Sequence, residues 1–353
     1  MEPVRLGVVG CGVIGKIHLR VATASPLTEV VAVADSREQA RKEVSELHGI
    51  QKFYVEGEDL FRDPDVEAVV LAMPAQNRAD LAIKAFALGK HVLTEKPVAT
   101  SAEQVRHMIT AQGDLTGACC SSRYTFLEST RVASDFVATG ALGDLRTVHC
   151  RVLTSVGAAP ASPPPPWRVS KRMNGGGILV NWRCYDLDYL MSIAGWKLKP
   201  KTVLAQAWPI AQHLSDRVDP ESDAETHFAA LILCEGGVAI SFERGEFTTA
   251  STRRAWEMIG SKGTLNLMMM RQPNKPHILT HDDTTPEAGV TSRTLWEGEL
   301  DMAALHSGVI EDFACAIREQ REPKTNLERA LVLQQITDAI YASAESGSAV
   351  TIV

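Results

Sequence analysis

A glycine pattern near the start of the chain, Gly10-Cys11-Gly12-Val13-Ile14-Gly15, constrains the fold more than any other feature of the sequence. It follows a strand-like apolar run, residues 4–9, and opens a helix-like run, residues 14–24. Gly10 permits a tight turn, Gly12 lets a pyrophosphate approach the backbone, and Gly15 allows close packing of helix on strand. The amide groups at the start of the helix then face the phosphates. In this context the pattern predicts a dinucleotide-binding fold.

An acidic residue follows the second strand-like run, residues 30–34, and strengthens that prediction. Asp35 lies twenty residues after Gly15 and is placed to accept hydrogen bonds from ribose hydroxyls. Its carboxylate repels a 2′-phosphate and favours NAD, whereas Arg37 would partly offset that repulsion, so NADP remains open. The cofactor contacts expected from these segments are Gly10, Gly12, Val13, Ile14, Gly15, Asp35, Ser36 and Arg37.

The pattern of predicted helices and strands changes near residue 122. Before it, strand-like and helix-like segments alternate, and near-continuous apolar strands such as residues 66–72 predict a parallel sheet covered on both faces. After it come long strand-like runs joined by glycine-containing turns at residues 235–237 and 261–263, which are typical of antiparallel hairpins. We therefore predict an α/β Rossmann NAD(P)-binding domain over 1–122. An α+β domain for substrate binding and oligomerisation, built on a large, mostly antiparallel open sheet, is predicted over 123–353.

Composition excludes several other classes of protein. The net charge is −7 and no basic run stands out, so nucleic acid is not an expected partner. No apolar stretch approaches the ~18–20 residues that span a bilayer, and residues 1–5 lack a signal-peptide pattern, so we expect a cytoplasmic protein without membrane contact. The seven cysteines are scattered, which favours reduced thiols, and the histidines lack metal-ligand spacing, so no metal is expected.

A lysine closes another strand of the predicted parallel sheet. Glu95-Lys96-Pro97 follows residues 91–94 at the carboxyl end of the strand, where ligands of such sheets bind. A desolvated lysine at that place can hydrogen-bond a substrate oxygen and stabilise the negative charge that develops on it. A solvated lysine at the start of a helix is the alternative.

At this point the sequence resembles the glucose–fructose oxidoreductase / inositol dehydrogenase / rhizopine-catabolism (Gfo/Idh/MocA) superfamily over essentially its whole length. Residues 87–97, ALGKHVLTEKP, are close to that family's signature segment, and His18 follows Gly15 by three residues. Where the family usually has Pro-Asn-x-x-His, this chain has Pro74 followed by Ala75 and Arg78 in place of the Asn and His. Also family-like are residues 140–143, Trp167-Arg168, residues 175–177 and residues 343–347. The resemblance implies an NAD(P)-dependent oxidoreductase that moves hydride at a hydroxyl-bearing carbon of a sugar, glycoside or cyclitol.

The helix after the glycine triplet departs from the family pattern. Asn181 stands where much of the family has Asp, and Tyr185 stands where a catalytic His is usual, although some members carry Tyr there. A phenol has an ordinary pKa of ~10, and a nearby lysine cation favours the phenolate. Tyr185 can then exchange the hydroxyl proton while Lys96 holds the same oxygen. A core aromatic is the alternative for Tyr185, and Asn181 can orient a hydroxyl without balancing the lysine's charge.

The resemblance extends the expected site and leaves alternatives for the activity. The proline-rich residues 163–166 are interpreted as a stiff loop leading into Trp167-Arg168, and Arg183 is expected on the helix side opposite Asn181. A homodimer or homotetramer is implied by the resemblance alone. The alternative functions are a redox-assisted glycosidase or aldose–aldose oxidoreductase with tightly bound NAD, and a non-catalytic sugar or nucleotide sensor. The expected catalytic residues are Lys96, Tyr185 and Asn181; the expected substrate residues are these three with Tyr124, Trp167 and Arg168; the further expected cofactor contacts are Ala72, Met73, Pro74, Asn77, Glu95, Lys96, Arg123, Trp167 and Arg168.

Overall fold

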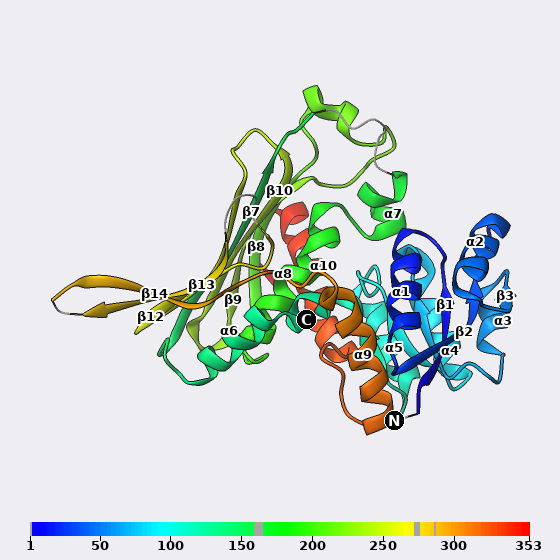
Figure 1. Ribbon diagram of the computed structural model, residues 1–353. Helices are drawn as coiled ribbons and strands as arrows, with labels where there is room; N and C mark the ends of the chain where they lie inside the picture. Colours follow the sequence, from blue (N-terminus) through cyan, green and yellow to red (C-terminus); the bar gives the residue numbers. More distant parts are fainter. Residues whose placement is uncertain (1, 159–164, 272–275, 286) are drawn as a thin grey trace. The chain divides into compact units, whose positions relative to one another are not determined.

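The computed structural model describes residues 2–158, 165–271, 276–285 and 287–353 (Figure 1). Its contacts divide the chain into two compact units, Met1–Arg123 with Met302–Gln334, and Tyr124–Asp301 with Gln335–Val353. The division into residues 1–122 and 123–353 that the sequence suggests stays a prediction. Of the proline-rich segment, residues 163 and 164 lie outside the described residues.

The first unit contains a six-stranded parallel sheet in the order β3-β2-β1-β4-β5-β6. The strands are β1 Val4–Val9, β2 Thr28–Ala34, β3 Lys52–Tyr54, β4 Ala68–Leu71, β5 His91–Thr94 and β6 Gly117–Cys119. All four residues of β4 are fully buried, as expected for a parallel strand covered on both faces. The strand order reverses between β1 and β4, which creates the crevice where ligands of doubly wound sheets bind.

Helices surround this sheet. They are α1 Val13–Ala24, α2 Glu38–His48, α3 Gly57–Phe61, α4 Arg78–Ala87, α5 Ala102–Gln112 and α9 Ala304–Glu319, with the 3₁₀ turn η1 Ala75–Asn77. The helix α9 packs against α1, so a segment from late in the chain covers the first unit. The start of α10 (Leu327–Ser346) adds Leu327 and Ala330 to the same apolar core. The 3₁₀ turn η2, Cys120–Phe126, crosses from the first unit to the second.

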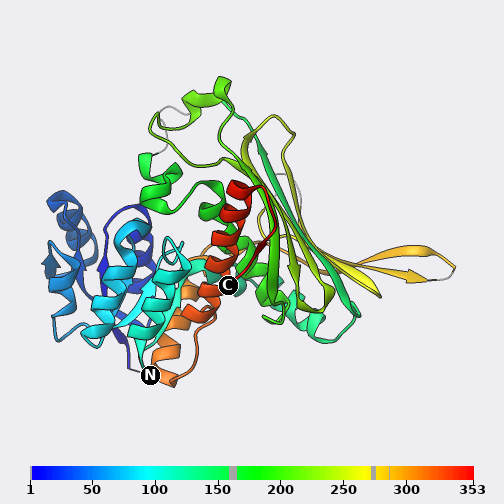
Figure 2. The same cartoon turned by 180° about the vertical axis from the view of Figure 1, so that it is seen from behind.

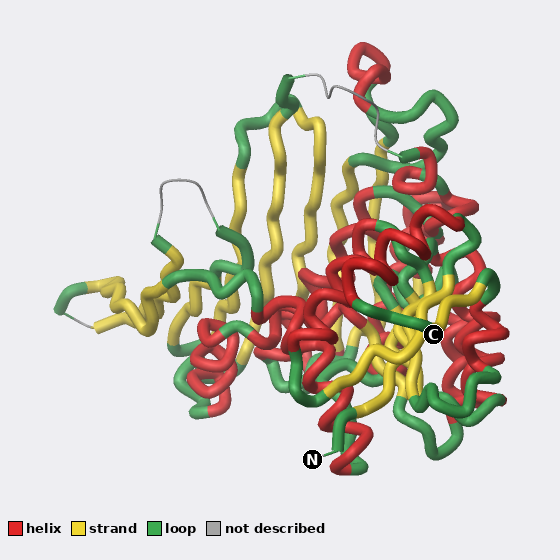
Figure 3. Tube along the Cα trace, turned by 45° about the vertical axis from the view of Figure 1, so that its right-hand side comes forward, coloured by secondary structure: helices red, strands yellow, loops and turns green. Residues whose placement is uncertain are grey.

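The second unit contains a nine-stranded sheet in the order β14-β13-β12-β11-β7-β10-β9-β8-β15. Figure 3 draws the strands of the molecule in yellow and its helices in red. Neighbouring strands are antiparallel except β7 and β10, which run parallel. The strands are β7 Leu145–Ser155, β8 Pro200–Trp208, β9 His227–Cys234, β10 Ala239–Thr248, β11 Arg253–Gly260, β12 Gly263–Leu267, β13 His277–Thr285, β14 Gly289–Gly298 and β15 Val350–Thr351. The predicted parallel sheet and mostly antiparallel sheet are both confirmed.

One face of this second sheet is covered by helices. Further helical elements of the second unit are α6 Glu128–Ala138, α7 Lys171–Asn174, α8 Ile178–Ile193, η3 Pro166–Val169, η4 Gln212–Arg217 and η5 Glu235–Gly237. Alternate residues of β9 and β10, such as Phe228 and Phe242, are buried, and α8 lies against these two strands. Leu204, Leu231 and Leu233, which point the other way, remain about half exposed. This alternation is the period of two that a half-covered sheet requires.

The hairpin β13–β14 lies beyond the two hairpins that the sequence predicts, whose turns are at residues 235–237 and 261–263. It projects beyond the rest of the sheet (Figures 1 and 2). Six consecutive residues at the start of β14 are exposed, so no apolar face imposes alternation on the sequence. The strand β4 covers residues 68–71 and is therefore shorter than the predicted run 66–72. No helix in the described part of the chain is long and apolar enough to cross a membrane.

Candidate functional site

The glycine loop joins β1 to α1 and has the shape of a phosphate-binding turn. Gly10 has a φ of +96°, and a Cβ there would lie 2.6 Å from the Ala72 carbonyl oxygen. A Cβ on Gly15 would overlap the Gly10 carbonyl, whereas a Cβ on Gly12 would meet nothing within 4 Å. Protein packing therefore explains Gly10 and Gly15 but leaves the space beside Gly12 open, as the approach of a pyrophosphate requires. These residues fit a dinucleotide.

The start of α1 shows the same openness. Gly12 is the N-cap and supplies no side-chain cap, so the first amides of the helix depend on another partner. The Val13 side chain is 85% exposed although it is apolar, and Ile14 is half-buried. A dinucleotide lying over this helix end would satisfy the amides and cover the valine.

Asp35 follows β2 and is bound to the glycine loop. Its Oδ2 accepts a 2.8 Å hydrogen bond from the Cys11 amide, and its Oδ1 accepts from the Arg37 amide at 2.9 Å. The Arg37 guanidinium also donates to both carboxylate oxygens, at 3.1 Å each. Burial on its own would raise the pKa of Asp35, but these hydrogen bonds outweigh it and the pKa is lowered. Asp35 is therefore an anionic acceptor at the carboxyl edge of the sheet, with Ser36 exposed beside it.

The loop after β4 lies beside the glycine loop. The Ala72 amide donates to Val9 at 2.8 Å, and Gly10 packs on the Ala72 carbonyl. Met73 and Pro74 continue this loop into η1, which ends at Asn77. These predicted cofactor residues therefore lie at the switch point between β1 and β4.

Arg78, which stands where the family has His, ties two loops of this edge together. It is 2% exposed, and its Nε donates to the Met73 carbonyl at 3.1 Å. Its Nη1 donates to the Glu95 carbonyl at 2.5 Å and also to the Pro97 carbonyl. The sequence marked Arg78 as a departure without assigning it a role, because its acceptors are backbone carbonyls that have no side-chain signature.

The backbone around Lys96 is fixed from both sides. The Lys96 amide donates to Glu95 Oε2 at 3.0 Å, while Arg78 holds the carbonyls of the two flanking residues, Glu95 and Pro97. Lys96 is the second residue after β5, at the carboxyl end of the sheet. The first unit thus holds a lysine backbone rigidly at the edge where ligands bind.

The Glu95 side chain is the centre of a buried ionic cluster. Its Oε1 lies 2.7 Å from His18 Nε2 and forms an ion pair with Arg123. Burial alone would raise the pKa of Glu95, but the charges of Arg123 and His18 outweigh it and hold the pKa well below its usual range. The structure therefore places Arg123, expected at the cofactor, in an ion pair within the first unit.

Cys120 completes this cluster, with its Sγ 3.9 Å from His18 Nε2. One ligand atom each from His18, Glu95 and Cys120 lie within 4.8 Å of one another, the spacing of a metal site. Because the same Glu95 oxygen is paired with a guanidinium, its charge is already balanced. All seven cysteines of the chain are thiols outside any disulfide.

In the second unit a buried carboxylate fixes the start of α8. Glu225 accepts from the amides of Gly177, at 3.1 Å, and Leu179, at 2.9 Å, and from the Tyr341 hydroxyl at 3.0 Å. A Cβ on Gly177 would overlap the Glu225 backbone, so the glycine triplet allows this close approach. A carboxylate at a helix N-terminus is stabilised by the unsatisfied amides and the helix dipole. The helix that carries Asn181 and Tyr185 therefore begins at a defined point.

Asn181 and Tyr185 occupy buried positions one turn apart on α8. The Asn181 Nδ2 donates to the Arg168 carbonyl at 2.8 Å, and its Oδ1 accepts from Asn174 at 3.2 Å. The Tyr185 ring is 5% exposed and packs edge-on against Tyr124, with ring centroids 5.6 Å apart. The structure thus brings the predicted residues Tyr124 and Tyr185 together, and Asn181 with Arg168. Arg183, expected on the other side of α8, is also buried.

Trp167 and Arg168 lie in η3, before α7. The Trp167 side chain is 37% exposed, and Arg168 Nη2 donates to Glu246 Oε2 at 2.8 Å. No sequence motif marks Glu246. The Asp186 carboxylate accepts from Arg244 at 2.7 Å and from Trp256 at 3.0 Å, and both partners lie far from it in the sequence.

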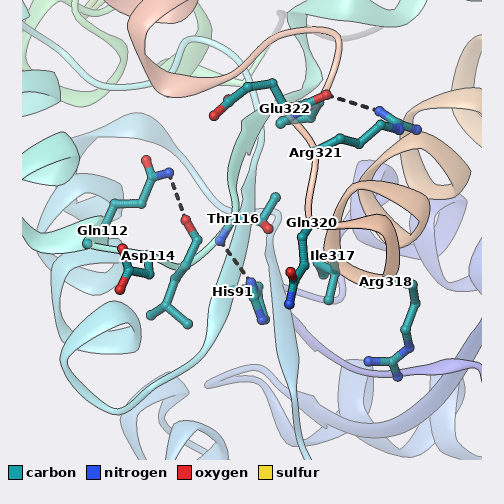
Figure 4. Close-up of a pocket in the computed structure, with 12 residues that line it drawn as sticks. His91, Gln112, Asp114, Thr116, Ile317, Arg318, Gln320, Arg321 and Glu322 are labelled. Carbon is teal, nitrogen blue, oxygen red and sulfur yellow. Dashed lines mark hydrogen bonds between the residues drawn. The ribbon is translucent and has the colours of Figure 1, made fainter.

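A pocket of about 620 Å³ lies elsewhere in the first unit (Figure 4). His91 Nδ1, at the start of β5, accepts from the Thr116 amide at 2.8 Å there, and Arg318 and Arg321 line its other side. This pocket is at the amino end of β5, whereas Lys96 follows the carboxyl end. It contains none of the predicted site residues.

Comparison with known proteins supports this arrangement over most of the chain. Residues 4–119 match a family model described as an oxidoreductase family with an NAD-binding Rossmann fold, and residues 130–266 match the GFO/IDH/MocA C-terminal domain. The 1,5-anhydro-D-fructose reductase of Ensifer adhaerens is 24% identical over 357 residues, 99% of this chain and 98% of that protein. The inositol 2-dehydrogenase of Pseudomonas savastanoi pv. phaseolicola is 40% identical over 110 residues, 31% of this chain and 33% of that protein.

Solved structures show the same fold. A levoglucosan dehydrogenase in complex with NADH superposes with a TM-score of 0.84 at 22% identity, covering 100% of both chains. The glycine loop, the acid after β2, the lysine after β5 and the two matched domain models all agree. The chain therefore belongs to the Gfo/Idh/MocA family of oxidoreductases with an NAD-binding Rossmann fold.

Proposed function

We propose that this protein moves hydride between NAD and a carbon that bears a secondary hydroxyl or ketone in a sugar, glycoside or cyclitol. The observation that carries the proposal is the fixed Lys96 backbone at the carboxyl edge of the sheet that also bears the open glycine loop. Relatives named inositol 2-dehydrogenase and 1,5-anhydro-D-fructose reductase support a polyhydroxylated substrate.

NAD, when bound, supplies the acceptor or donor of the hydride. The glycine loop, Asp35 and the loop at Ala72–Asn77 would hold it, because these residues line the open carboxyl edge of the first unit. Asp35 favours NAD, since its anionic carboxylate disfavours a 2′-phosphate at the same ribose. Trp167 and Arg168 are further proposed contacts.

Lys96 and Tyr185 are proposed to act on one substrate oxygen. The Lys96 ammonium donates a hydrogen bond to that oxygen and stabilises the negative charge that develops during hydride transfer. The Tyr185 phenolate takes the hydroxyl proton in the oxidative direction, and the phenol so formed returns it in the reductive direction. Asn181, already bonded to Arg168, orients a neighbouring hydroxyl. Lys96 belongs to the first unit and Tyr185 to the second, so this convergence on one atom is part of the proposal.

We also propose that the protein assembles as a homodimer or homotetramer. The uncovered face of the second sheet carries three exposed leucines, Leu204, Leu231 and Leu233, and such a patch favours burial in an assembly. Light scattering on the purified protein tests this, and a monomer at high concentration would contradict it.

A panel of neutral sugars and cyclitols tests the activity by the absorbance band of reduced nicotinamide. Steady growth of the band with added NAD supports a dehydrogenase. A spectral change without added cofactor and without net turnover would instead indicate a redox-assisted glycosidase or aldose–aldose oxidoreductase. No change with any member of the panel would contradict the proposal and favour a sensor.

A further inference from the structure

A distortion near the end of β10 directs the Glu246 side chain. Gly245 pairs with Leu153 of β7 and Thr248 pairs with Ser155, so two residues of β10 lie opposite one residue of β7. The extra residue produces a β-bulge, a feature that reorients side chains and is frequent beside functional sites. Phe247, inside the bulge, has a φ of +57°, which is a strained conformation for a bulky residue.

Side-chain packing stabilises the strained backbone conformation of Phe247. Its side chain contacts the small apolar cluster of Val169, Val218 and Ala224. Val169 is the neighbour of Arg168, so the bulge and the η3 turn are joined through this cluster. The bulge therefore fixes Glu246 and Arg168 with respect to each other.

Only one oxygen of the buried Glu246 carboxylate accepts a hydrogen bond within the described residues. Its side chain is 12% exposed, and its Oε2 accepts from Arg168. Its Oε1 is buried and has no hydrogen-bond partner among the described residues. Burial raises the pKa of Glu246, and the charges of Arg168 and Arg244 only partly offset this. Leaving a buried acceptor without a donor costs folding free energy and calls for an explanation. A hydroxyl group of a bound ligand is one such donor.

The unused oxygen belongs to the part of the second unit that carries the proposed substrate residues. Arg168 connects Glu246 to α8, because its carbonyl accepts from Asn181 at 2.8 Å. Trp167, next to Arg168, keeps 37% of its surface exposed, as a ring that stacks on a sugar would. Asn181, Arg168 and Glu246 thus form one connected set of hydrogen-bonding groups.

We propose that Glu246 and Arg168 form a subsite that binds hydroxyl groups of an uncharged sugar or cyclitol and excludes sugar acids and sugar phosphates. This rests on the function proposed above. A hydroxyl both donates and accepts, so it can serve the free carboxylate oxygen and a guanidinium donor together. An anionic group would meet an ion pair whose two charges already balance, so nothing would offset the cost of taking its own charge out of water.

The test compares a neutral sugar with its acid, D-glucose with D-glucuronate and D-galactose with D-galacturonate, by kcat/KM in the wild type and in Glu246→Gln. The substitution keeps the shape and removes the charge. Loss of a hydrogen bond to a charged group should lower kcat/KM for the neutral sugar about tenfold or more. Because Arg168 then lacks a balancing charge and can pair with the acid, the acid-to-neutral ratio of kcat/KM should rise about tenfold.

Glu243→Gln is the matched control. Glu243 lies on the same strand and is paired with an arginine, Arg151, at 2.6 Å, but on a more exposed surface. In Glu243→Gln the acid-to-neutral ratio of kcat/KM should stay at the wild-type value. NADH binding, measured by fluorescence titration, should be the same in all variants, which shows that the first unit is intact.

Glu246→Asp gives a second test if Glu246→Gln does not fold. It keeps the charge but withdraws it by one methylene, so the neutral rate should fall while the acid stays excluded. An unchanged ratio in Glu246→Gln, or an unchanged neutral rate in Glu246→Asp, overturns the subsite. If the wild type turns over no neutral sugar, the proposed function itself fails and the subsite fails with it.

Discussion

The Arg78 guanidinium donates a 2.5 Å hydrogen bond to the carbonyl oxygen of Glu95, the residue immediately before Lys96. It also donates to the carbonyl of Pro97, the residue immediately after. A third acceptor, the Met73 carbonyl, lies in the loop that adjoins the glycine turn. Arg78 is therefore a positioning residue for the lysine that we propose to hold the substrate oxygen.

Arg78→Met should lower kcat by about ten- to a hundredfold, because a small displacement of a reacting group is costly to catalysis. Three backbone carbonyls, two of them in buried hydrogen bonds, also lose a donor, so the melting temperature should fall. Steady-state kinetics measure the change in kcat, thermal melting measures the change in stability, and NADH titration shows whether the cofactor still binds. The control is Arg62→Met, an exposed arginine that pairs with Asp59 at 3.0 Å. A kcat that matches this control would remove Arg78 from the mechanism.

Lys96→Ala should reduce turnover by about a hundred- to a thousandfold, the range for loss of a donor that stabilises a developing charge. NADH should still bind, since the glycine loop and Asp35 are untouched. Lys84→Ala, which removes an exposed lysine paired with Glu58, is the control. Comparable turnover in the Lys96 variant would contradict a role for the ammonium.

Tyr185→Phe should lower kcat by about a hundredfold or more, the size of a lost general acid–base step. The basic limb of the pH–rate profile should disappear with the phenol. Tyr189→Phe is the matched control one turn along α8. The Tyr189 hydroxyl is buried without a hydrogen-bond partner among the described residues, so its loss should cost little. An unchanged pH profile in Tyr185→Phe would assign the proton to another group.

Asp35→Ser should shift the cofactor preference from NAD towards NADP. In the wild type the Arg37 guanidinium is engaged by the Asp35 carboxylate. The substitution removes the charge that repels a 2′-phosphate and releases Arg37 to bind it. The ratio of kcat/KM for NADP to that for NAD should rise about tenfold or more, the effect of one charge-assisted contact. A ratio that stays at the wild-type value would show that other groups set the preference.

The Glu95 cluster should make stability depend on acid pH. The pKa of Glu95 is lowered in the folded state. The ionised carboxylate therefore stabilises the fold fully at pH values above the ordinary carboxylate pKa. This stabilisation is lost as the pH falls from there through the pKa of the folded state. Glu95→Gln should melt several degrees below the wild type at pH 7, and the difference should shrink towards pH 3. Glu58→Gln, on an exposed pair, should show a small difference throughout. A difference in melting temperature between the wild type and Glu95→Gln that does not depend on pH would contradict this role of the ionised carboxylate.

The sequence predicted the elements that have a strong local pattern. The glycine loop, the acid after β2 and the lysine after β5 are marked by fixed residue types at fixed distances from apolar strands. The turns at residues 235–237 and 261–263 lie between antiparallel pairs, as predicted. These features are local because turn chemistry and strand burial are properties of a few adjacent residues.

The contacts that refine the site have no such pattern. Arg78 binds backbone carbonyls, and Glu246 meets Arg168 from within a bulge of β10, a feature that depends on the pairing with β7. The β13–β14 hairpin was missed because its exposed outer strand has no apolar alternation. Residues 302–334 group with the first unit through packing such as α9 on α1, which no local periodicity encodes.

The position of β7 in the second sheet has a consequence for how that sheet forms. β7 lies between β10 and β11, which are successive in the chain, and it joins the group β8, β9, β10 and β15 to the group β11–β14. Each group can make hairpins by itself, but within the described strands they become one sheet only when β7 inserts between them. Backbone amides of β7 should therefore be among the last in this sheet to exchange with deuterated water, and substitutions that weaken β7 should uncouple the unfolding of the two groups.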